Sequence, residues 1–383
     1  MSAHYRSLVC NGPGRMSRAG PRHDGRVGVL VMAHGTPADP SGLEAFYTRI
    51  RRGSAPSAAQ LADLVRRYEA IGGTSPLAAR TAAQVAGITT ALEAAEPGTF
   101  VVRFGAKHSE PFIEDAARAL AASGVGSVVG VVLAPHRASM GSEEYLDRAA
   151  AALAATPAAP PLVRVQQWYD APGFAALVAD RVLAALDELA SPGVAGGGRR
   201  APQRAARPVR TTVLFTAHSL PVRVIAAGDV YPDHVAASAA AAAGLAGLER
   251  RGVSWEVAWQ SAGRTPEPWI GPDLLAVLRR LGAEARDASA EGRVVVCPIG
   301  FVADHLEVLY DVDVEAREVA AEEALAFTRT ASLNDDPRFC TVVAGAVRAS
   351  VHEGLSRHEG HRGHEGLGPG ADAGPGQPGK VTG

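Results

Sequence analysis

The sequence from Thr211 to Pro221 is TTVLFTAHSLP. Its apolar and β-branched residues run directly into Ala-His-Ser-Leu-Pro, and a short apolar run that stops near a proline predicts a buried parallel strand. His218 then comes at the carboxyl end of that strand. In open α/β sheets this edge is where ligands bind. The stretch therefore predicts an α/β sheet with His218 at a ligand site.

The same pattern occurs earlier in the chain. Residues 29–37 are VLVMAHGTP and residues 213–221 are VLFTAHSLP, so each apolar run leads into Ala-His, two further residues and Pro. Each run also opens a series of alternating strands and helices. We expect two similar lobes that turn their carboxyl-edge loops toward a shared cleft. The alternative is a coincidence between two buried strands, which the matched Ala-His-x-x-Pro disfavours.

Apolar runs alternate with helical patterns along most of the chain. The expected strands are 26–33, 100–104, 127–134, 162–169, 211–217, 254–259 and 293–298, and the expected helices are 41–52, 57–70, one from 76 onward, 111–122, 142–155, 173–190, 232–250, 273–282, 314–326 and 336–350. This alternation predicts parallel sheets. The predicted fold is α/β, with two similar Rossmann-like lobes, each a parallel β-sheet flanked by helices, and a cleft between them.

Composition suggests where the lobes begin and end. We expect lobes at 26–190 and 211–351, joined by 191–210, a Gly-, Pro- and Arg-rich linker without an apolar period. Residues 1–25 lack the apolar core of a signal peptide and predict a disordered extension. Residues 352–383 are rich in Gly and His and predict a disordered tail, with a weak metal-sequestering tail as the alternative.

Overall composition excludes several classes of protein. The formal net charge of −2 does not suggest a nucleic-acid binder. The three cysteines, Cys10, Cys297 and Cys340, are too far apart for a zinc or iron–sulfur spacing, which fits a reduced cytosolic setting. No apolar run approaches the roughly 18–20 residues that span a bilayer. We therefore expect a cytoplasmic protein.

A row of carboxylates stands out further along the chain. Asp304, Glu307, Asp311 and Glu315 are separated by three, four and four positions, which on a helix places them along one face. The segment is otherwise apolar, so we expect it to be largely buried, and a buried acidic row implies a nearby cation or carboxyls with raised pKa. The alternative is a solvated helix face. Together with His218, such carboxylates suit transient handling of Fe²⁺ better than a closed structural zinc site.

The first lobe carries a different set of side chains. Arginines and a tyrosine precede the loop IGGTSPL, and a helix that starts at Pro76 points free N–H groups at whatever lies before it. Arg binds carboxylates in two-pronged fashion, so this lobe is suited to a polycarboxylate. Ordinary surface arginines are the alternative, strongest for Arg52 and Arg66. Trp259 and Tyr145 are candidates for lining a flat aromatic ligand, although both residues equally suit a core.

Several motifs together resemble the ferrochelatase family, whose members insert ferrous iron into a porphyrin. The motifs are VMAHGTP (31–37), RRYEAIGGTSPL (66–77), KHSEPFIEDA (107–116), LAPH (133–136), FTAHSLP (215–221), YPD (231–233), WQSAGRTPEPWIGPD (259–273) and VCPIGFVADHLEVLYDVD (296–313). The resemblance covers about residues 26–350 in collinear order. The chain looks most similar to the Gram-positive type, which uses coproporphyrin III.

The resemblance implies a role for particular residues. His218 and Glu307 match the catalytic histidine and its partner carboxylate, and both are implied metal ligands, with Asp311 and Glu315 on an acidic path for the metal. The implied porphyrin-binding residues are His34, Arg51, Arg67, Tyr68, Ser75, His108 and Tyr145; Trp259 joins them as a candidate that rests on its residue type alone. His34 stands where the Gram-positive type often has a tyrosine that reaches the product iron, and a histidine there suits the same axial position.

The implied reaction is insertion of Fe²⁺ into coproporphyrin III with release of two protons, in haem biosynthesis. It uses Fe²⁺ as a substrate and needs no organic cofactor. A monomer is expected, with a transient handover to the next haem-pathway enzyme. Three alternatives stay open: a protoporphyrin IX ferrochelatase, a cobalt or nickel chelatase acting on a sirohydrochlorin-type ring, and a porphyrin or haem carrier without catalysis. The acidic row argues against a carrier, which has no need of a metal path.

Overall fold

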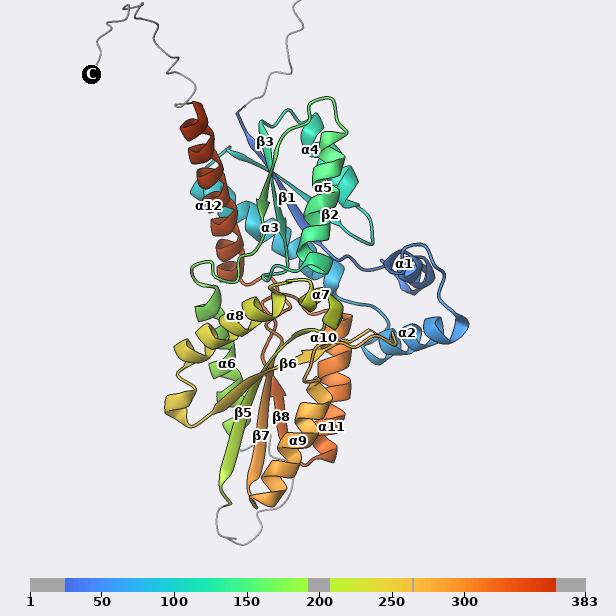
Figure 1. Ribbon diagram of the computed structural model, residues 1–383, viewed down its shortest axis with the longest axis vertical. Helices are drawn as coiled ribbons and strands as arrows, with labels where there is room; N and C mark the ends of the chain where they lie inside the picture. The colour runs from blue at the N-terminus through green and yellow to red at the C-terminus, as the bar shows by residue number, and fades with distance from the viewer. Residues whose placement is uncertain (1–24, 192–206, 264, 363–383) are drawn as a thin grey trace, which may run out of the picture.

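The computed structural model describes residues 25–191, 207–263 and 265–362, and within these it forms two parallel sheets of four strands (Figure 1). The first sheet has the order β2-β1-β3-β4, and its strands are β1 (Val27–Ala33), β2 (Phe100–Ala106), β3 (Ser127–Val132) and β4 (Leu162–Val165). The second has the order β6-β5-β7-β8, and its strands are β5 (Val209–His218), β6 (Ser254–Gln260), β7 (Glu291–Cys297) and β8 (Ala326–Arg329). The predicted two-lobed α/β fold is confirmed.

The repeat noticed in the sequence corresponds to equivalent strands. β1 pairs with β2 and β3, and β5 pairs in the same way with β6 and β7. Each of these first strands therefore lies at the point where the strand order reverses, which is where open α/β sheets bind ligands. His34 follows the last residue of β1, and His218 is the last residue of β5. The two Ala-His pairs thus occupy matching positions in the two lobes.

Helices cover both faces of each sheet because the strands are apolar on both sides. On β1, Leu30 and Met32 face one helical layer while Val29 and Val31 face the other. The first layer is α4 (Ile113–Ala122) and α5 (Glu144–Ala154), and the second includes α3 (Leu77–Ala95). On the second sheet the layers are α9 (Leu274–Asp287) with α11 (Arg317–Glu322), and α8 (Tyr231–Ala246) with α6 (Phe174–Ala190).

Two helices cross between the lobes. α6 precedes the linker yet packs against α8, β7 and β8 of the second lobe. The last helix, α12 (Pro337–Arg362), returns to pack against α3, β3 and β4 of the first lobe (Figure 1). Trp168 lies at the crossing, with ring centroids 5.4 Å from Phe174 and 5.8 Å from Phe339. The expected lobes, 26–190 and 211–351, therefore exchange one helix each, because each sheet face needs an apolar helix that the other segment supplies.

Some elements differ from expectation. The helix expected at 314–326 ends early, and the edge strand β8 begins at its last expected residue, Ala326. The helix ends because Ala324 takes a left-handed φ of 55°. The short helix α7 (Val222–Ala226) was not expected. α12 continues to Arg362, so the tail expected from 352 begins as helix. The expected extension, most of the linker and residues 363–383 lie outside the described ranges. None of the described helices is long and apolar enough to cross a membrane.

A further pair of helices forms an arm beside the first lobe. α1 (Leu43–Ile50) and α2 (Ala58–Ala70) lie away from both sheets and contact each other (Figure 1). α2 begins with a capping box, in which Ser57 and Gln60 satisfy each other's backbone N–H groups. Its far side contacts α10 (Leu306–Tyr310) of the second lobe. The arm thereby bridges the two lobes on one side of the space between them.

Candidate active site

A cavity of about 1320 Å³ lies between the carboxyl edges of the two sheets. The ends of β1, β3, β5 and β6 open into it, as does the arm formed by α1 and α2. Every predicted site residue except Trp259 lines this cavity: His34, Arg51, Arg67, Tyr68, Ser75, His108, Tyr145, His218, Glu307, Asp311 and Glu315. The fold therefore brings together residues that are up to 281 positions apart, from His34 to Glu315 (315 − 34).

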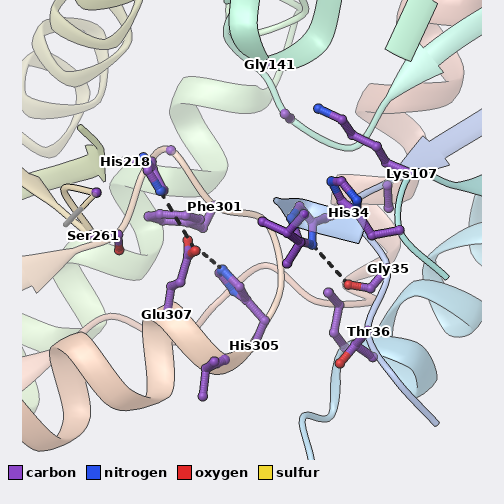
Figure 2. Close-up of a pocket in the computed structure, with 18 of the residues that line it drawn as sticks. His34, Gly35, Thr36, Lys107, Gly141, His218, Ser261, Phe301, His305 and Glu307 are labelled. Carbon is purple, nitrogen blue, oxygen red and sulfur yellow. Dashed lines mark hydrogen bonds and ion pairs between the residues drawn. The ribbon is translucent and has the colours of Figure 1, made fainter. Parts of the chain in front are cut away.

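His218 and Glu307 face each other, as the sequence predicted. The Nδ1–H of His218 donates to the Ser219 carbonyl at 2.5 Å, which leaves Nε2 as the ring nitrogen that can accept a proton or bind a metal. Nε2 lies 3.8 Å from Oε1 of Glu307 (Figure 2). About a third of each side chain is exposed, to the cavity. The pair is open to a substrate.

Glu307 also contacts a second histidine. Nε2 of His305 lies 3.7 Å from Oε2 of Glu307, and its Nδ1–H donates to the Ala303 carbonyl at 2.9 Å (Figure 2). Burial works to raise the pKa of Glu307, but His218 and His305 outweigh it and bring the pKa to about 2. Burial works to lower the pKa of His305, and Glu307 reverses this and raises it. Glu307 is therefore an anion between two imidazoles at neutral pH.

His34 approaches from the first lobe. Its Nδ1 donates to the Gly35 carbonyl at 3.1 Å, so it has the same tautomer as its counterpart His218. Its ring centroid lies 4.7 Å from that of His108. Burial lowers the pKa of His34, and burial together with His34 lowers the pKa of His108 to about 3. Both rings are neutral at physiological pH and keep a lone pair available to a metal or a donor.

The turn after β1 requires a glycine. Gly35 has a φ of 86°, and a Cβ at this position would lie 2.4 Å from Oγ of Ser109 and 2.9 Å from Cβ of Ala106. Such contacts are shorter than packed atoms tolerate. The glycine lets the chain turn His34 over the cavity while β1 stays in register with β2.

Three carboxylates of the predicted acidic row line the cavity. They are Glu307 on α10, Asp311 at the start of the π-helical turn Asp311–Ala316, and Glu315 within that turn. Burial and the neighbouring charge of Glu307 raise the pKa of Asp311 to about 7. Ser261 donates a short hydrogen bond to Oδ2 of Asp311. Wide π-helical turns are frequent at functional sites.

Asp304 does not belong to this row. The helix begins at Leu306, so Asp304 lies before it, and its carboxylate turns away from the cavity toward β8 and the following loop. It accepts hydrogen bonds from Ser332 at 2.7 Å and Asn334 at 2.9 Å, and it pairs with Arg329 at 3.3 Å. Asp304 holds the loop before α10 in place.

The carboxylates and histidines are not arranged as a closed metal cage. In the described ranges, no group of three or more His, Cys, Asp or Glu side chains is placed to hold a metal ion. The predicted ligand set of His218, Glu307, Asp311 and Glu315 is instead spread from the end of β5 along α10 and the π-helical turn Asp311–Ala316. This spread suits an ion that passes along the row as a substrate, and the set remains a prediction.

The arm contributes basic and hydroxyl groups. Arg51 donates through Nε to the Ser54 carbonyl at 3.2 Å, and Arg67 lies between Asp63 at 3.2 Å and Asp311 at 3.5 Å. The hydroxyl of Tyr68 lies 3.3 Å from Oγ1 of Thr36. Ser75 accepts from the N–H of Leu77 at the start of α3. The polar groups of these residues reach the cavity wall on the side of the first lobe.

Of the two aromatic candidates, one lines the cavity and the other lies in the core. Tyr145 is buried and lines the cavity, with Nζ of Lys107 4.9 Å from its ring centroid. Trp259 is 6% exposed and packs in the core beside Tyr231, with ring centroids 5.8 Å apart, so its assignment to the porphyrin site is not supported. It belongs to β6, where its side chain points to the helical face rather than to the carboxyl edge.

Sequence reasoning did not assign several residues of the cavity wall. They are Lys107, Arg148, Ser261, Trp269, Phe301 and His305. Trp269, ten positions after Trp259, lines the cavity with its ring centroid 6.4 Å from that of His218. Its position in a loop after β6, rather than in the strand, was the available signal. His305 precedes the acidic helix directly, which was also visible in the sequence.

The sequence of this chain is similar to those of known proteins. The family model that matches residues 26–351 is that of ferrochelatase. A coproporphyrin III ferrochelatase of Geobacillus thermodenitrificans is 39% identical over 84% of this chain and 95% of its own length. One of Geobacillus kaustophilus is 40% identical over 84% and 94%. Among solved structures, SirB from Bacillus subtilis with Fe³⁺ matches with a TM-score of 0.49 and 12% identity, over 85% of this chain and 95% of that one. The family match and the identity over most of both chains show that this protein belongs to the ferrochelatase family.

Proposed function

We propose that this chain inserts Fe²⁺ into coproporphyrin III, with release of two protons, as a step of haem biosynthesis. The relatives that support this substrate are named coproporphyrin III ferrochelatases and are matched over nearly their whole length. The observation that carries the proposal is the approach of His218 Nε2 to Glu307 Oε1, 3.8 Å apart in a cavity of about 1320 Å³. The cavity has room for a flat macrocycle, and the pair supplies a proton acceptor beside an anion.

The macrocycle is held through its carboxylates. Arg51 and Arg67 face the cavity from the arm, and Lys107 and Arg148 face it from the first lobe. Guanidinium groups bind carboxylates through two parallel hydrogen bonds, which fixes the orientation of the ring as well as its affinity. Tyr68, Ser75 and Tyr145 add hydroxyl groups or ring surface to the same wall. Lys107 and Arg148 are also paired with Glu144 and Glu114, so a porphyrin carboxylate shares these two cations with the protein's own acids.

Proton removal is the work of His218. A porphyrin loses two N–H protons when a metal enters, and those protons lie in the ring plane until the ring is distorted. Binding energy at the remote carboxylates supplies that distortion. The free Nε2 of His218 accepts one proton, with the Glu307 anion stabilising the imidazolium that forms, and passes it to water in the open cavity before it accepts the second. His305 on the other side of Glu307 keeps the carboxylate ionised and in place.

Fe²⁺ reaches the ring along the acidic row. Glu315, Asp311 and Glu307 offer successive oxygen ligands that replace the ion's water molecules. On the opposite face of the ring, the neutral Nε2 of His34 is suited to bind the iron once it is in the plane. His108 packs beside His34, with the two rings tilted by 52°, and restrains its ring. The proposal requires no organic cofactor.

We also propose that the protein acts as a cytoplasmic monomer and hands its product transiently to the next enzyme of the pathway. The cavity is formed by a single chain, with both walls supplied by its two lobes. No second copy is needed to complete the described site.

The direct test adds Fe²⁺ anaerobically to the protein with coproporphyrin III and, in parallel, with protoporphyrin IX, and follows absorbance. The free-base spectrum of coproporphyrin III should convert to that of the iron complex faster than the spectrum of protoporphyrin IX. Faster conversion of protoporphyrin IX would reassign the substrate. Tight binding of both rings without any conversion would identify a carrier, and conversion only of a sirohydrochlorin with Co²⁺ or Ni²⁺ would identify the other chelatase class.

A further inference from the structure

Arg67 occupies a position that links the two substrates of the proposed reaction. Its Nη1 lies 3.5 Å from Oδ1 of Asp311, which comes from the other lobe, and its Nε lies 3.2 Å from Asp63 on its own helix. Its guanidinium also lies 4.8 Å from the ring centroid of Tyr310. Arg67 is therefore shared between several partners and is optimally placed for none of them.

The contact with Asp311 is a weak version of an Arg–carboxylate pair. Strong pairs are bidentate, with N···O distances of about 2.7–2.9 Å. Here a single contact of 3.5 Å joins a side chain that is 23% exposed to one that is 8% exposed. A carboxylate that enters the cavity and offers both oxygens would compete well for the same guanidinium. Arg67 lines the cavity, so such a group can reach it.

Asp311 in turn depends on this contact for its charge balance. It lies between Glu307 and Glu315 on the same cavity wall, and both of these neighbours repel its anion. Arg67 is the cation paired with it, and Ser261 donates to its second oxygen. When Arg67 pairs with another anion, Asp311 loses its cationic partner. Its carboxylate then faces the cavity beside the negatively charged Glu307. The carboxylate then favours a positively charged ligand, and a divalent cation competes with the proton for it.

We infer that Arg67 couples the binding of the two substrates: a porphyrin carboxylate draws the guanidinium away from Asp311, and the released carboxylate becomes a ligand for the incoming Fe²⁺. This inference rests on the proposed function. Binding of the macrocycle is then the event that makes Asp311 available to the metal. Before the macrocycle binds, the Arg67–Asp311 pair keeps the row poorly receptive to metal.

The test measures metal affinity by calorimetry, with Co²⁺ as an air-stable divalent ion of similar ligand preference. The macrocycle is N-methylated coproporphyrin III, which keeps all four carboxylates while its substituted ring nitrogen hinders metal insertion. In wild type, the macrocycle should tighten Co²⁺ binding by about fivefold or more, the usual scale of coupling between sites. By reciprocity, Co²⁺ should tighten macrocycle binding by the same factor.

The variant Arg67→Met removes the cation and keeps the length of the side chain. Without macrocycle, it should bind Co²⁺ about fivefold more tightly than wild type, the order expected for loss of one ion pair. Adding the macrocycle should then change the Co²⁺ affinity little. Equal affinities of variant and wild type without macrocycle, or a full macrocycle effect in the variant, would overturn the inference.

Arg66→Met is the matched control, since Arg66 is adjacent, pairs with Asp63 and is 64% exposed. It should behave as wild type; an equal gain in Co²⁺ affinity would show a general charge effect and refute a specific contact. Asp311→Asn should abolish the macrocycle effect on Co²⁺ binding, and retention of that effect would also count against the inference.

Conversion of coproporphyrin III with Fe²⁺ by the wild-type protein distinguishes failure of this inference from failure of the proposed function. Conversion without any coupling between macrocycle and Co²⁺ rejects only the inference about Arg67. Absence of conversion rejects the proposed function.

Discussion

In the proposed reaction His218 accepts a proton beside the Glu307 anion, so removing the imidazole should have a distinct signature. In His218→Ala the ring nitrogen that accepts the proton is gone, and iron insertion should fall by about 10²–10⁴-fold, the usual contribution of a general base. Binding of coproporphyrin III, followed by fluorescence quenching, should be nearly unchanged because the carboxylates are held elsewhere. His352→Ala, on α12 outside the cavity lining, is the control and should retain activity. Unchanged turnover in His218→Ala would refute this catalytic role.

Asp311 should make stability depend on pH. Its folded pKa of about 7 lies above the unfolded value near 3.8. As pH rises between these values, the unfolded chain loses its proton first, so the folded state becomes relatively less stable. Asp311→Asn does not titrate, and its thermal midpoint without metal should exceed that of wild type by more at pH 8 than at pH 5. A difference in midpoint that is the same at both pH values would contradict this account.

At the residue scale, the sequence identified the side chains that stand at the ends of β-strands. His218 and His34 are fixed by the ends of β5 and β1, and the short runs before them indicated those ends. Trp259 could not be separated from Trp269 in the same way. Both are aromatic residues near β6, and only the direction in which the strand alternates decides that Trp259 enters the core.

The turn that carries His34 offers a prediction at the scale of a single element. In Gly35→Ala the added Cβ is strained by the left-handed φ of 86° and by close contacts with Ser109 and Ala106. The substitution should therefore lower the free energy of unfolding by about 2–4 kcal/mol. Gly53→Ala is the matched control, with a φ of 92° and no atom within 4 Å of the added Cβ. It should lose only about 1 kcal/mol. Chemical denaturation measures both, and equal losses would refute the close approach.

Elements were predicted well where an apolar period was long and poorly where it was short. β8 has four residues and follows an Ala-rich helical pattern, so its strand character was hidden in the sequence. The acidic row was predicted as one helical face from Asp304 to Glu315. The helix instead starts at Leu306 and widens into a π-helical turn at Asp311, which keeps three carboxylates together and turns Asp304 toward Arg329.

At the scale of the whole molecule, the exchanged helices make each lobe depend on the other. α6 covers the second sheet and α12 covers the first, and one continuous apolar cluster contains residues of both sheets. Heating should therefore unfold both lobes in one transition, with equal calorimetric and van't Hoff enthalpies. Two separated transitions in a scanning calorimeter would show that the lobes fold independently. The sequence repeat predicted the two lobes, but it contains no sign of the exchange, which only tertiary packing reveals.

The proposed reaction requires a macrocycle between the two lobes, and a crystal structure with metal-free coproporphyrin III tests this directly. The ring should lie between His34 and His218, with a pyrrole nitrogen within hydrogen-bond reach of Nε2 of His218, about 3.2 Å or one water molecule away. Its carboxylates should contact Arg51 and Arg67. A ring bound outside this cavity, or one whose nitrogens are out of reach of both His218 and Glu307, would contradict the account.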